Sequence, residues 1–281
     1  QVKFEKYLTD AFSEKAVEFI NESSQPFMMY LAYNAVHTPM QATDEDMAKF
    51  EGHPRQKLAA MTYALDRGVG TVIRGLKDSG KFDNTLIFFL SDNGGATTNQ
   101  SSNYPLKGFK GNKFEGGHRV PYFVVWKNGI PAGKPYDGLV SSLDIFATAI
   151  DAASISKTRN RLDGVSLLPY LKGKKGEPHK VLYWRKMDTR AIRSGDYKLI
   201  ITHGVDSVLY NIRRDPEEMN NLINKEPDLY HKLAKKLAKW EKNECIEPSW
   251  LEEGWRKITN RYHQQLMHNE IKTAQDLYKK K

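Results

Sequence analysis

Two hydrophobic patterns divide the chain. Three continuously apolar runs have the length of strands buried on both faces of a sheet. They cover residues 27–33, 85–90 and 120–126. Apolar residues recur at helical spacing in three further segments, 12–20, 58–79 and 143–155. We expect the first of these helices to begin at an N-cap formed by Thr9-Asp10. This order of elements predicts an α/β fold with a mostly parallel sheet flanked by helices.

The pattern changes after about residue 172, where a polar connector rich in Gly, Pro and Lys begins. Four short strand-like pieces follow, separated by polar residues. They cover residues 181–185, 190–193, 197–202 and 207–210. Such short connections predict an antiparallel meander. Leu229, Leu233, Leu237 and Trp240 then share one face of a predicted helix. We therefore expect two domains, residues 1–176 and 177–281; residues 246–281 give no clear pattern.

Composition is ordinary for a folded chain of 281 residues, with 40% hydrophobic and 27% charged residues. The single cysteine, Cys245, excludes a disulfide scaffold. No apolar run approaches the roughly 18–20 residues of a membrane helix, so no membrane span is expected. The N-terminus begins at Gln1 and has no apolar stretch typical of a signal peptide. We expect a chain that opens in this way to have been cut from a longer one.

The net charge of +9 is concentrated in the middle of the chain. Residues 101–200 contain 18 basic and 8 acidic side chains, a balance of +10. This excess indicates an anionic partner such as phosphate, sulfate or an acidic glycan, or else a lysine-rich solvated surface. We favour the solvated surface for the tail, which ends at Lys281. No zinc-finger, RNP or helix-turn-helix signature is present, so no nucleic acid is expected.

Polar residues with metal-binding chemistry follow the second predicted strand, in the segment Ser91-Asp92-Asn93-Gly94-Gly95. Ligands of open α/β sheets sit at the carboxyl ends of strands. Asp92 and Asn93 offer a carboxylate and an amide oxygen, which are hard ligands suited to Ca²⁺ or Mg²⁺. The same residues also suit a tight turn, for which Asn-Gly is a favoured pair.

Two further segments could contact an anion. His37 follows the first predicted strand and could protonate a leaving group or contact an anion, although a structural histidine fits as well. The segment 106–121 contains four glycines and the basic residues Lys107, Lys110 and Lys113, together with Arg119. Glycines allow close backbone approach to a ligand and lysines neutralise charge, but a solvated loop would look similar.

Short motifs occur in one characteristic order along about 220 residues, from about Tyr7 to Asn224. They are Tyr7-Leu8-Thr9-Asp10, His37-Thr38-Pro39, Asp83-Asn84-Thr85, Ser91-Asp92-Asn93-Gly94-Gly95, Lys110-Gly111, Glu115-Gly116-Gly117-His118-Arg119-Val120-Pro121, Leu143-Asp144, Leu162-Asp163-Gly164-Val165-Ser166-Leu167-Leu168-Pro169 and Leu209-Tyr210-Asn211. In this order the chain resembles the formylglycine-dependent sulfatases of the alkaline phosphatase-like superfamily. The Glu-Gly-Gly-x-Arg-Val-Pro segment is the most specific of the motifs.

The resemblance implies a sulfatase, a sulfuric ester hydrolase acting on a sulfated glycan or an aryl sulfate. It implies that Asp92 and Asn93 are ligands of one Ca²⁺. Lys110, five residues before Glu115, matches the lysine that contacts the sulfate of the substrate. His37 matches the histidine that contacts the sulfate and assists departure of the alcohol. The resemblance also implies an extracytoplasmic location: periplasmic, secreted or lysosomal.

Four other charged residues of the 106–121 segment have lesser expected roles. Glu115 and Arg119 should shape the loop without a catalytic role. Lys107 and Lys113 could be secondary anion contacts, but we favour surface positions for both.

One departure from the family pattern is serious. The family's nucleophile is a formylglycine made from the Cys or Ser of a Cys/Ser-x-Pro-x-Arg motif, and this sequence has no such motif. We therefore expect the C-terminal portion of a sulfatase, inactive alone, with residues 1–176 as the C-terminal half of the catalytic domain and 177–281 as the C-terminal subdomain. The alternatives are a phosphate or phosphonate ester hydrolase of the same superfamily and a non-catalytic protein that binds anionic glycans.

Overall fold

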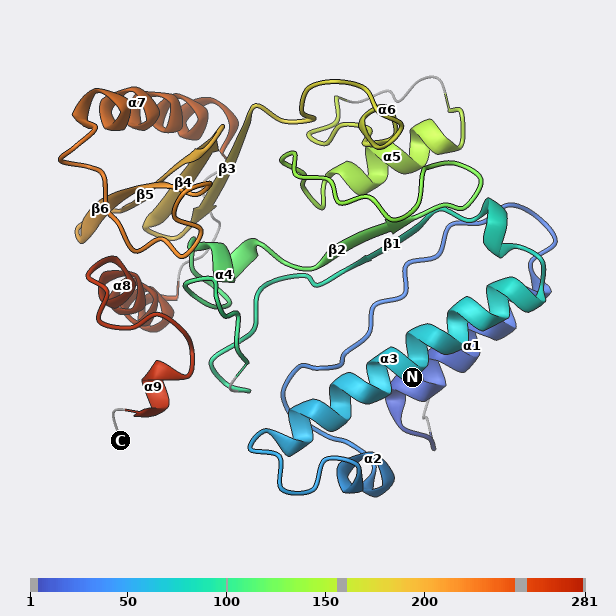
Figure 1. Cartoon of the computed structure of the whole chain (residues 1–281). Helices are drawn as coiled ribbons and strands as arrows, with labels where there is room; N and C mark the ends of the chain where they lie inside the picture. The colour runs from blue at the N-terminus through green and yellow to red at the C-terminus, as the bar shows by residue number, and fades with distance from the viewer. Residues whose placement is uncertain (1–4, 100, 156–160, 246–251, 280–281) are drawn as a thin grey trace. The chain divides into compact units, whose positions relative to one another are not determined.

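The computed structural model describes every residue except 1–4, 100, 156–160, 246–251 and 280–281 (Figure 1). The chain forms two compact units. The first comprises Gln1–Ile87 and Val124–Ala132, and the second comprises Phe88–Phe123 and Gly133–Lys281. No helix of the described residues has both the length and the apolar character needed to cross a membrane. The domain boundary expected after residue 176 stays a prediction.

Helices dominate the first unit. They are α1 (Leu8–Glu22), α2 (Asp44–Ala48), α3 (Gln56–Asp78) and the short 3₁₀ helix η1 (Phe82–Asn84). Helix α3 confirms the long helix predicted from apolar spacing, and α1 packs against it. A Cβ added at Gly68 of α3 would stand 2.6 Å from Ser13 Oγ, and one at Gly75 would stand 2.8 Å from Val17 Cγ2. These glycines therefore let the two helices approach closely.

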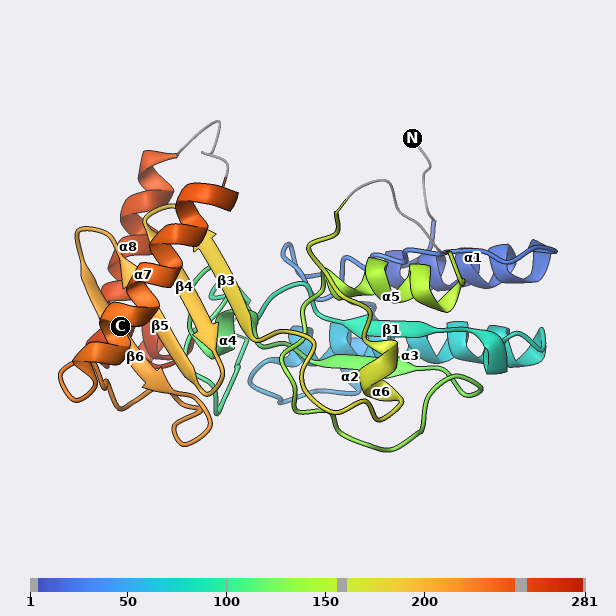
Figure 2. The same ribbon diagram turned by 90° about the horizontal axis from the view of Figure 1, so that it is seen from above.

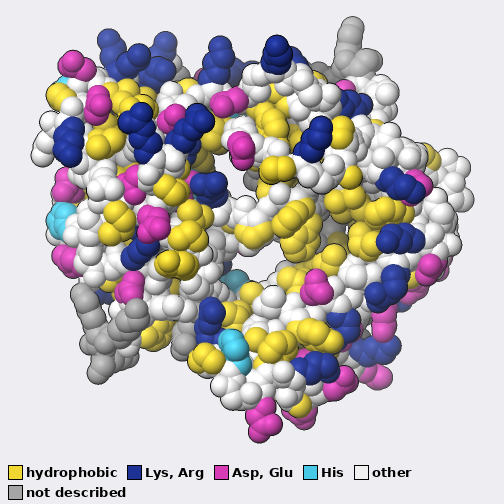
Figure 3. All heavy atoms as spheres, viewed as in Figure 1, with side chains coloured by type: hydrophobic (Ala, Val, Ile, Leu, Met, Phe, Trp, Pro, Cys, Tyr) yellow, Lys and Arg dark blue, Asp and Glu magenta, His cyan; other side chains and the backbone are white. Residues whose placement is uncertain are grey.

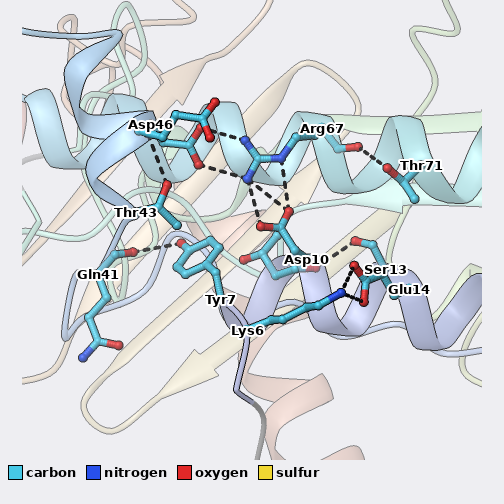
Figure 4. A network of polar contacts seen from close by, with 12 residues as sticks. Lys6, Tyr7, Asp10, Ser13, Glu14, Gln41, Thr43, Asp46, Arg67 and Thr71 are labelled. Carbon is cyan, nitrogen blue, oxygen red and sulfur yellow. Dashed lines mark hydrogen bonds and ion pairs between the residues drawn. The ribbon is translucent and has the colours of Figure 1, made fainter.

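An arginine links the three α-helices of this unit (Figure 4). Arg67 of α3 donates from Nη1 to Asp46 Oδ1 of α2 at 2.7 Å and from Nε to Asp10 Oδ1 of α1 at 3.1 Å. Asp46 is only 1% exposed. The N-cap expected at Thr9-Asp10 is wrong, because α1 already begins at Leu8 and Asp10 lies in its first turn. The Asp10 carboxylate forms an ion pair with Arg67 and does not cap the helix.

The strand expected over residues 27–33 is not formed. Within the described residues this segment pairs with no strand, and its side chains alternate between half-buried and exposed. Met28 is 70% exposed and Tyr30 is 91% exposed. A strand needs a neighbouring strand with which its N–H and C=O groups form hydrogen bonds. The apolar composition of the run was therefore not sufficient to define a strand here.

The two other apolar runs form a two-stranded sheet of β1 (Ile87–Leu90) and β2 (Tyr122–Val125). Beyond the strand ends, Ser91 N donates to Pro121 O at 3.3 Å and Gly94 N donates to Gly117 O at 3.1 Å. These bonds join the segment after β1 to the segment before β2 in antiparallel order. Helices α4 (Glu115–His118), α5 (Asp144–Ala152) and α6 (Leu168–Leu171) complete this region.

The second half of the chain forms the predicted antiparallel meander, with strands in the order β3-β4-β5-β6. Their bounds are β3 Val181–Lys186, β4 Thr189–Ser194, β5 Tyr197–Thr202 and β6 Asp206–Asn211. Alternate side chains serve opposite faces, as the pleat requires. Leu199 packs with Leu233 and Leu237, whereas its neighbour Ile200 packs with Phe109 and Phe114.

Helices cover both faces of this meander (Figure 2). Helix α7 (Pro227–Glu244) covers the Leu199 face, as its apolar stripe predicted. Helices α8 (Glu253–Met267) and α9 (Asp276–Lys279) contribute to the core on the Ile200 face. Dark-blue basic side chains gather over α7 (Figure 3), whose outer lysines are exposed. Helix α7 therefore presents a basic surface to solvent.

Candidate functional site

The turn Ser91–Gly95 follows β1 directly, which is the position expected for a ligand-binding segment. Ser91 Oγ donates to Asn93 O at 2.8 Å, and Asn93 Nδ2 donates to Gly94 O at 3.1 Å. The turn is thus held by its own short polar side chains. Asp92 is exposed, so its carboxylate is accessible at the carboxyl end of the strand.

The turn crosses the Glu-Gly-Gly segment at very short range. A Cβ added at Gly94 would stand 1.8 Å from Gly116 O, so only glycine fits at this crossing. One residue later, Gly95 O accepts a hydrogen bond from Lys110 N at 3.0 Å. Gly94 and Gly95 therefore hold the loop that carries Lys110 against the segment that contains Asp92 and Asn93.

Asn103 strengthens the same junction, and sequence reasoning missed it. Its Oδ1 accepts from Gly95 N at 2.7 Å, while its Nδ2 donates to Gly108 O at 3.1 Å. One side chain thus bridges the turn and the loop. An asparagine in a Ser/Asn-rich stretch looks like an ordinary loop residue, so no pattern in the sequence indicates this role.

A buried ionic network supports the loop from beneath. Lys198 of β5 is fully buried, and its Nζ lies 2.9 Å from Glu115 Oε1 and 2.8 Å from Glu218 Oε1. Glu218 Oε2 also accepts from Glu115 N at 2.6 Å. Burial acts to raise the pKa of Glu115, but the groups around it, Lys198 foremost and Arg193 among them, together lower this pKa below its usual value. Burial raises the pKa of Glu218.

This network gives Glu115 the structural role expected for it. Arg119 Nη1 lies 3.5 Å from Glu115 Oε2, which agrees with its expected role in shaping the loop. Lys198 and Glu218 were not recognised from the sequence. A lysine within a strand and a glutamate within an acidic loop carry no mark of burial in the sequence.

Lys107 is not on the surface, and the expectation for it is corrected. Its side chain is fully buried, and Nζ donates to Glu218 O at 3.0 Å and to Asn269 Oδ1 at 2.6 Å. Burial lowers its pKa to about 8. A lysine so enclosed cannot reach a bound substrate, so Lys107 belongs to the support of the loop.

Lys110 and Lys113 lie on the same loop above this network. Lys110 is exposed and Lys113 is partly buried. The backbone bond from Lys110 N to Gly95 O places the lysine beside the turn that carries Asp92 and Asn93. Three of the four predicted site residues thus belong to directly bonded segments of one unit.

His37, the fourth, belongs to the first unit. It is exposed, and its Nδ1 donates to Thr38 O at 2.6 Å. A carbonyl oxygen can only accept, so this bond keeps the proton on Nδ1. Nε2 is then the nitrogen that can exchange a proton. That His37 shares one site with Lys110 stays a prediction.

The chemistry of the turn fits a calcium ion in part. Asp92 supplies a carboxylate, and the hydrogen bond from Asn93 Nδ2 leaves the amide oxygen of Asn93 as its ligand atom. Ca²⁺ takes six to eight oxygen ligands, so two side chains make an incomplete shell. In the described part of the chain, no group of three or more His, Cys, Asp or Glu side chains could hold a metal ion.

Comparison with known proteins identifies the family. The sequence model described as Sulfatase matches residues 1–155, and the one described as N-sulphoglucosamine sulphohydrolase, C-terminal, matches residues 110–243. The first match covers more than half of the chain. The chain belongs to the sulfatase family. Sulfatases are sulfuric ester hydrolases that generally use a metal ion, typically Ca²⁺.

Curated relatives agree with this assignment. The uncharacterized sulfatase YdeN of Escherichia coli strain K12 is 40% identical over 63% of this chain and 33% of its own length. The N-acetylgalactosamine-6-sulfatase of Canis lupus familiaris is 32% identical over 69% of this chain and 38% of its own length. The matched part of the chain therefore spans about a third of the length of these relatives.

Solved structures confirm the α/β, alkaline phosphatase-like fold of the sulfatase. Ps i-CgsB in complex with k-i-k-neocarrahexaose shares 36% identity and a TM-score of 0.83, over 93% of this chain and 60% of that one. A phosphonate monoester hydrolase of Agrobacterium radiobacter shares 22% identity and a TM-score of 0.54, over 86% of this chain and 51% of that one. The second likeness concerns the fold alone.

Proposed function

We propose that this sulfatase chain supplies the sulfate-binding and metal-binding half of a site that hydrolyses sulfate esters. The observation that carries the proposal is the bond from Lys110 N to Gly95 O, which joins the anion-binding lysine to the turn of Asp92 and Asn93. A cation site and an anion-neutralising ammonium beside each other suit a sulfate group, which has several negative oxygens to stabilise.

Each residue has a distinct part in this chemistry. Lys110 Nζ binds a sulfate oxygen and neutralises charge that grows as the S–O bond breaks. His37 donates its Nε2 proton to the departing alkoxide, which needs the imidazolium form. Asp92 and Asn93 contribute oxygen ligands to Ca²⁺, which when bound would polarise the sulfate. We assign no nucleophile to this chain, because it has no Cys/Ser-x-Pro-x-Arg motif.

The substrate class that we propose is a sulfated glycan. The solved relative of 36% identity is in complex with k-i-k-neocarrahexaose, and the canine relative is named N-acetylgalactosamine-6-sulfatase. The positive balance of residues 101–200 also suits an anionic polymer more than a small aryl sulfate. An extracytoplasmic location, where such glycans occur, is part of this proposal.

A calorimetric titration of the 281-residue chain tests the function. We expect a sulfated oligosaccharide to bind in the presence of Ca²⁺ and to lose about tenfold in affinity on Lys110→Ala, the loss expected of one hydrogen bond to a charged group. Asp92→Ala should remove the dependence of this binding on Ca²⁺. Lys127→Ala is the matched control, because Lys127 is exposed and pairs with Asp83 of its own unit.

Two results would contradict the proposal. Equal affinity of the wild type and Lys110→Ala would show that the lysine does not contact the anion. Tighter binding of a phosphonate monoester than of the matching sulfate ester, with transition metals in place of Ca²⁺, would favour the phosphonate or phosphate ester hydrolase instead.

A further inference from the structure

The turn between Lys110 and Lys113 lies against the end of strand β3. Gly111 has φ +96°, and a Cβ added there would stand 3.0 Å from Lys186 Nζ, at the last residue of the strand. The Lys186 ammonium therefore lies close to Gly111, between the two loop lysines. A strand residue far away in the sequence is thus placed beside the loop that carries Lys110 and Lys113, within the second unit.

A second contact fixes the same loop to the same strand. Trp184 lies two residues before Lys186 and so on the same face of β3. The His118 ring stacks on Trp184 with centroids 4.4 Å apart, and its Nε2 hydrogen-bonds to Lys113 O at 3.1 Å. Since a carbonyl accepts, Nε2 is the donor. The loop around Lys113 therefore lies against β3 at two positions, Trp184 and Lys186.

The charges of this group act on each other. Burial lowers the pKa of Lys186, and the Lys110 ammonium lowers it further. Burial also lowers the pKa of Lys113, to about 8, with smaller effects of Lys186 and Lys198. In the part of the chain that the structure describes, no carboxylate forms an ion pair with Lys113 or Lys186.

A buried histidine lies in the field of the same group. His263 of α8 is fully buried, and its Nδ1 donates to Thr259 O at 2.8 Å. Burial lowers its pKa to about 4, and Lys113 and Lys186 contribute to the fall. The ring is therefore neutral at pH 7 and offers no compensating charge. Ammonium groups gathered in this way repel one another until an anion binds between them.

We propose that Lys113 and Lys186 form a second anion subsite beside Lys110, which binds a further sulfate or carboxylate group of the same glycan. The subsite rests on the proposed function, because Lys110 holds the sulfate to be removed. It makes the chain selective for glycans that carry two or more acidic groups, since a neutral neighbouring sugar would leave the charges of Lys113 and Lys186 without a counter-charge.

The test compares two tetrasaccharides of the same backbone, one with a single sulfate ester in all and the other with two on neighbouring sugars. Calorimetry on the 281-residue chain with Ca²⁺ measures both affinities. We expect the wild type to bind the more sulfated one about tenfold more tightly. Lys186→Ala should remove this preference and change the affinity for the less sulfated one by less than about twofold. Lys186→Arg should keep the preference.

Lys236→Ala is the control. Lys236 is an exposed lysine of α7, so this substitution removes the same charge from another face of the meander. Circular dichroism checks that each variant is folded. A preference that persists in Lys186→Ala overturns the subsite, while loss of binding in Lys110→Ala would still support the function. Equal weakening of both tetrasaccharides by Lys186→Ala also overturns it. No binding of either one by the wild type overturns the function and the subsite together.

Discussion

The Arg67 guanidinium hydrogen-bonds to carboxylates of two other helices, Asp10 of α1 and Asp46 of α2. These two carboxylates differ in burial. Asp46 is 1% exposed, and its backbone N–H donates to Oγ1 of Thr43, the N-cap of α2, at 3.2 Å. Hydrogen bonds from Arg67 lower the pKa of Asp46 and outweigh its burial. The pair therefore stabilises the first unit only while Asp46 is ionised.

We predict that Asp46→Asn lowers the free energy of unfolding by about 2 kcal/mol at pH 7, the value expected of hydrogen bonds to a charged group. Because the pKa of Asp46 is lowered in the folded state, this stability is fully present above the ordinary pKa of about 3.9 and is lost as pH falls through the folded value. Urea titrations at pH 7 and below pH 3 should show the difference between wild type and variant shrinking in acid.

The exposed pair of Lys6 and Glu14 provides the control. Its side chains are 65% and 54% exposed, so Glu14→Gln should change stability by less than about 1 kcal/mol at either pH. A loss in Asp46→Asn no larger than this would show that the network of Figure 4 contributes little to stability.

Single residues also mark the limit of what the sequence could predict. Asp92, Asn93 and Lys110 could be predicted as site residues because their motifs are spaced and ordered as in one family. Lys107 was misplaced at the surface because a lysine is usually solvated, and nothing nearby in sequence shows that Asn269, 162 residues away, accepts its hydrogen bond. Burial of a charge depends on distant partners, which local patterns do not contain.

At the scale of elements, periodicity predicted what depends on one local face. Helix α3 and strand β5 (Tyr197–Thr202) lie where their apolar spacing placed them. The run 27–33 failed because a strand is defined by its neighbour as well as by its own residues. The crossing of the Gly94 turn with the Glu-Gly-Gly segment was likewise beyond reach, since it needs a fold to bring two loops together.

That crossing gives a sharp prediction for Gly94→Ala. The added Cβ would meet Gly116 O at 1.8 Å, and because this oxygen belongs to the backbone, one of the two segments must move. We expect affinity for a sulfated oligosaccharide to fall by at least about tenfold, because the bond from Lys110 N to Gly95 O depends on the crossing. Gly254→Ala in α8 is the control, since nothing lies within 4 Å of its added Cβ. Unchanged affinity in Gly94→Ala would contradict the role of this junction.

The buried network beneath the loop predicts a loss of stability for Lys198→Met. Removing the ammonium leaves the Glu115 and Glu218 carboxylates buried without their lysine, which costs about 3–5 kcal/mol. Adding Glu218→Gln to this variant removes one of the two buried carboxylates and should recover part of the lost stability. Chemical unfolding of the two variants measures this, and a double variant less stable than Lys198→Met would count against the network as described.

For the whole molecule, belonging to the sulfatase family and being able to turn over a substrate are separate questions. The family match covers residues 1–155 and the site motifs are present, yet no Cys/Ser-x-Pro-x-Arg motif occurs in the 281 residues. Binding and electrostatic stabilisation can persist without a covalent nucleophile, but turnover then falls by many orders of magnitude. The chain should therefore bind sulfate esters without consuming them.

We predict no hydrolysis of 4-nitrophenyl sulfate above the buffer rate by the 281-residue chain with Ca²⁺ present. A fusion that places the N-terminal part of the Escherichia coli relative before this chain, produced with a formylglycine-generating enzyme, should gain turnover if that part carries the motif. Lys110→Ala in the fusion should lower this turnover by about 100-fold, the loss typical of one group that stabilises transition-state charge. Hydrolysis by the chain alone, abolished by Lys110→Ala, would instead show that its own residues provide a nucleophile outside the formylglycine motif.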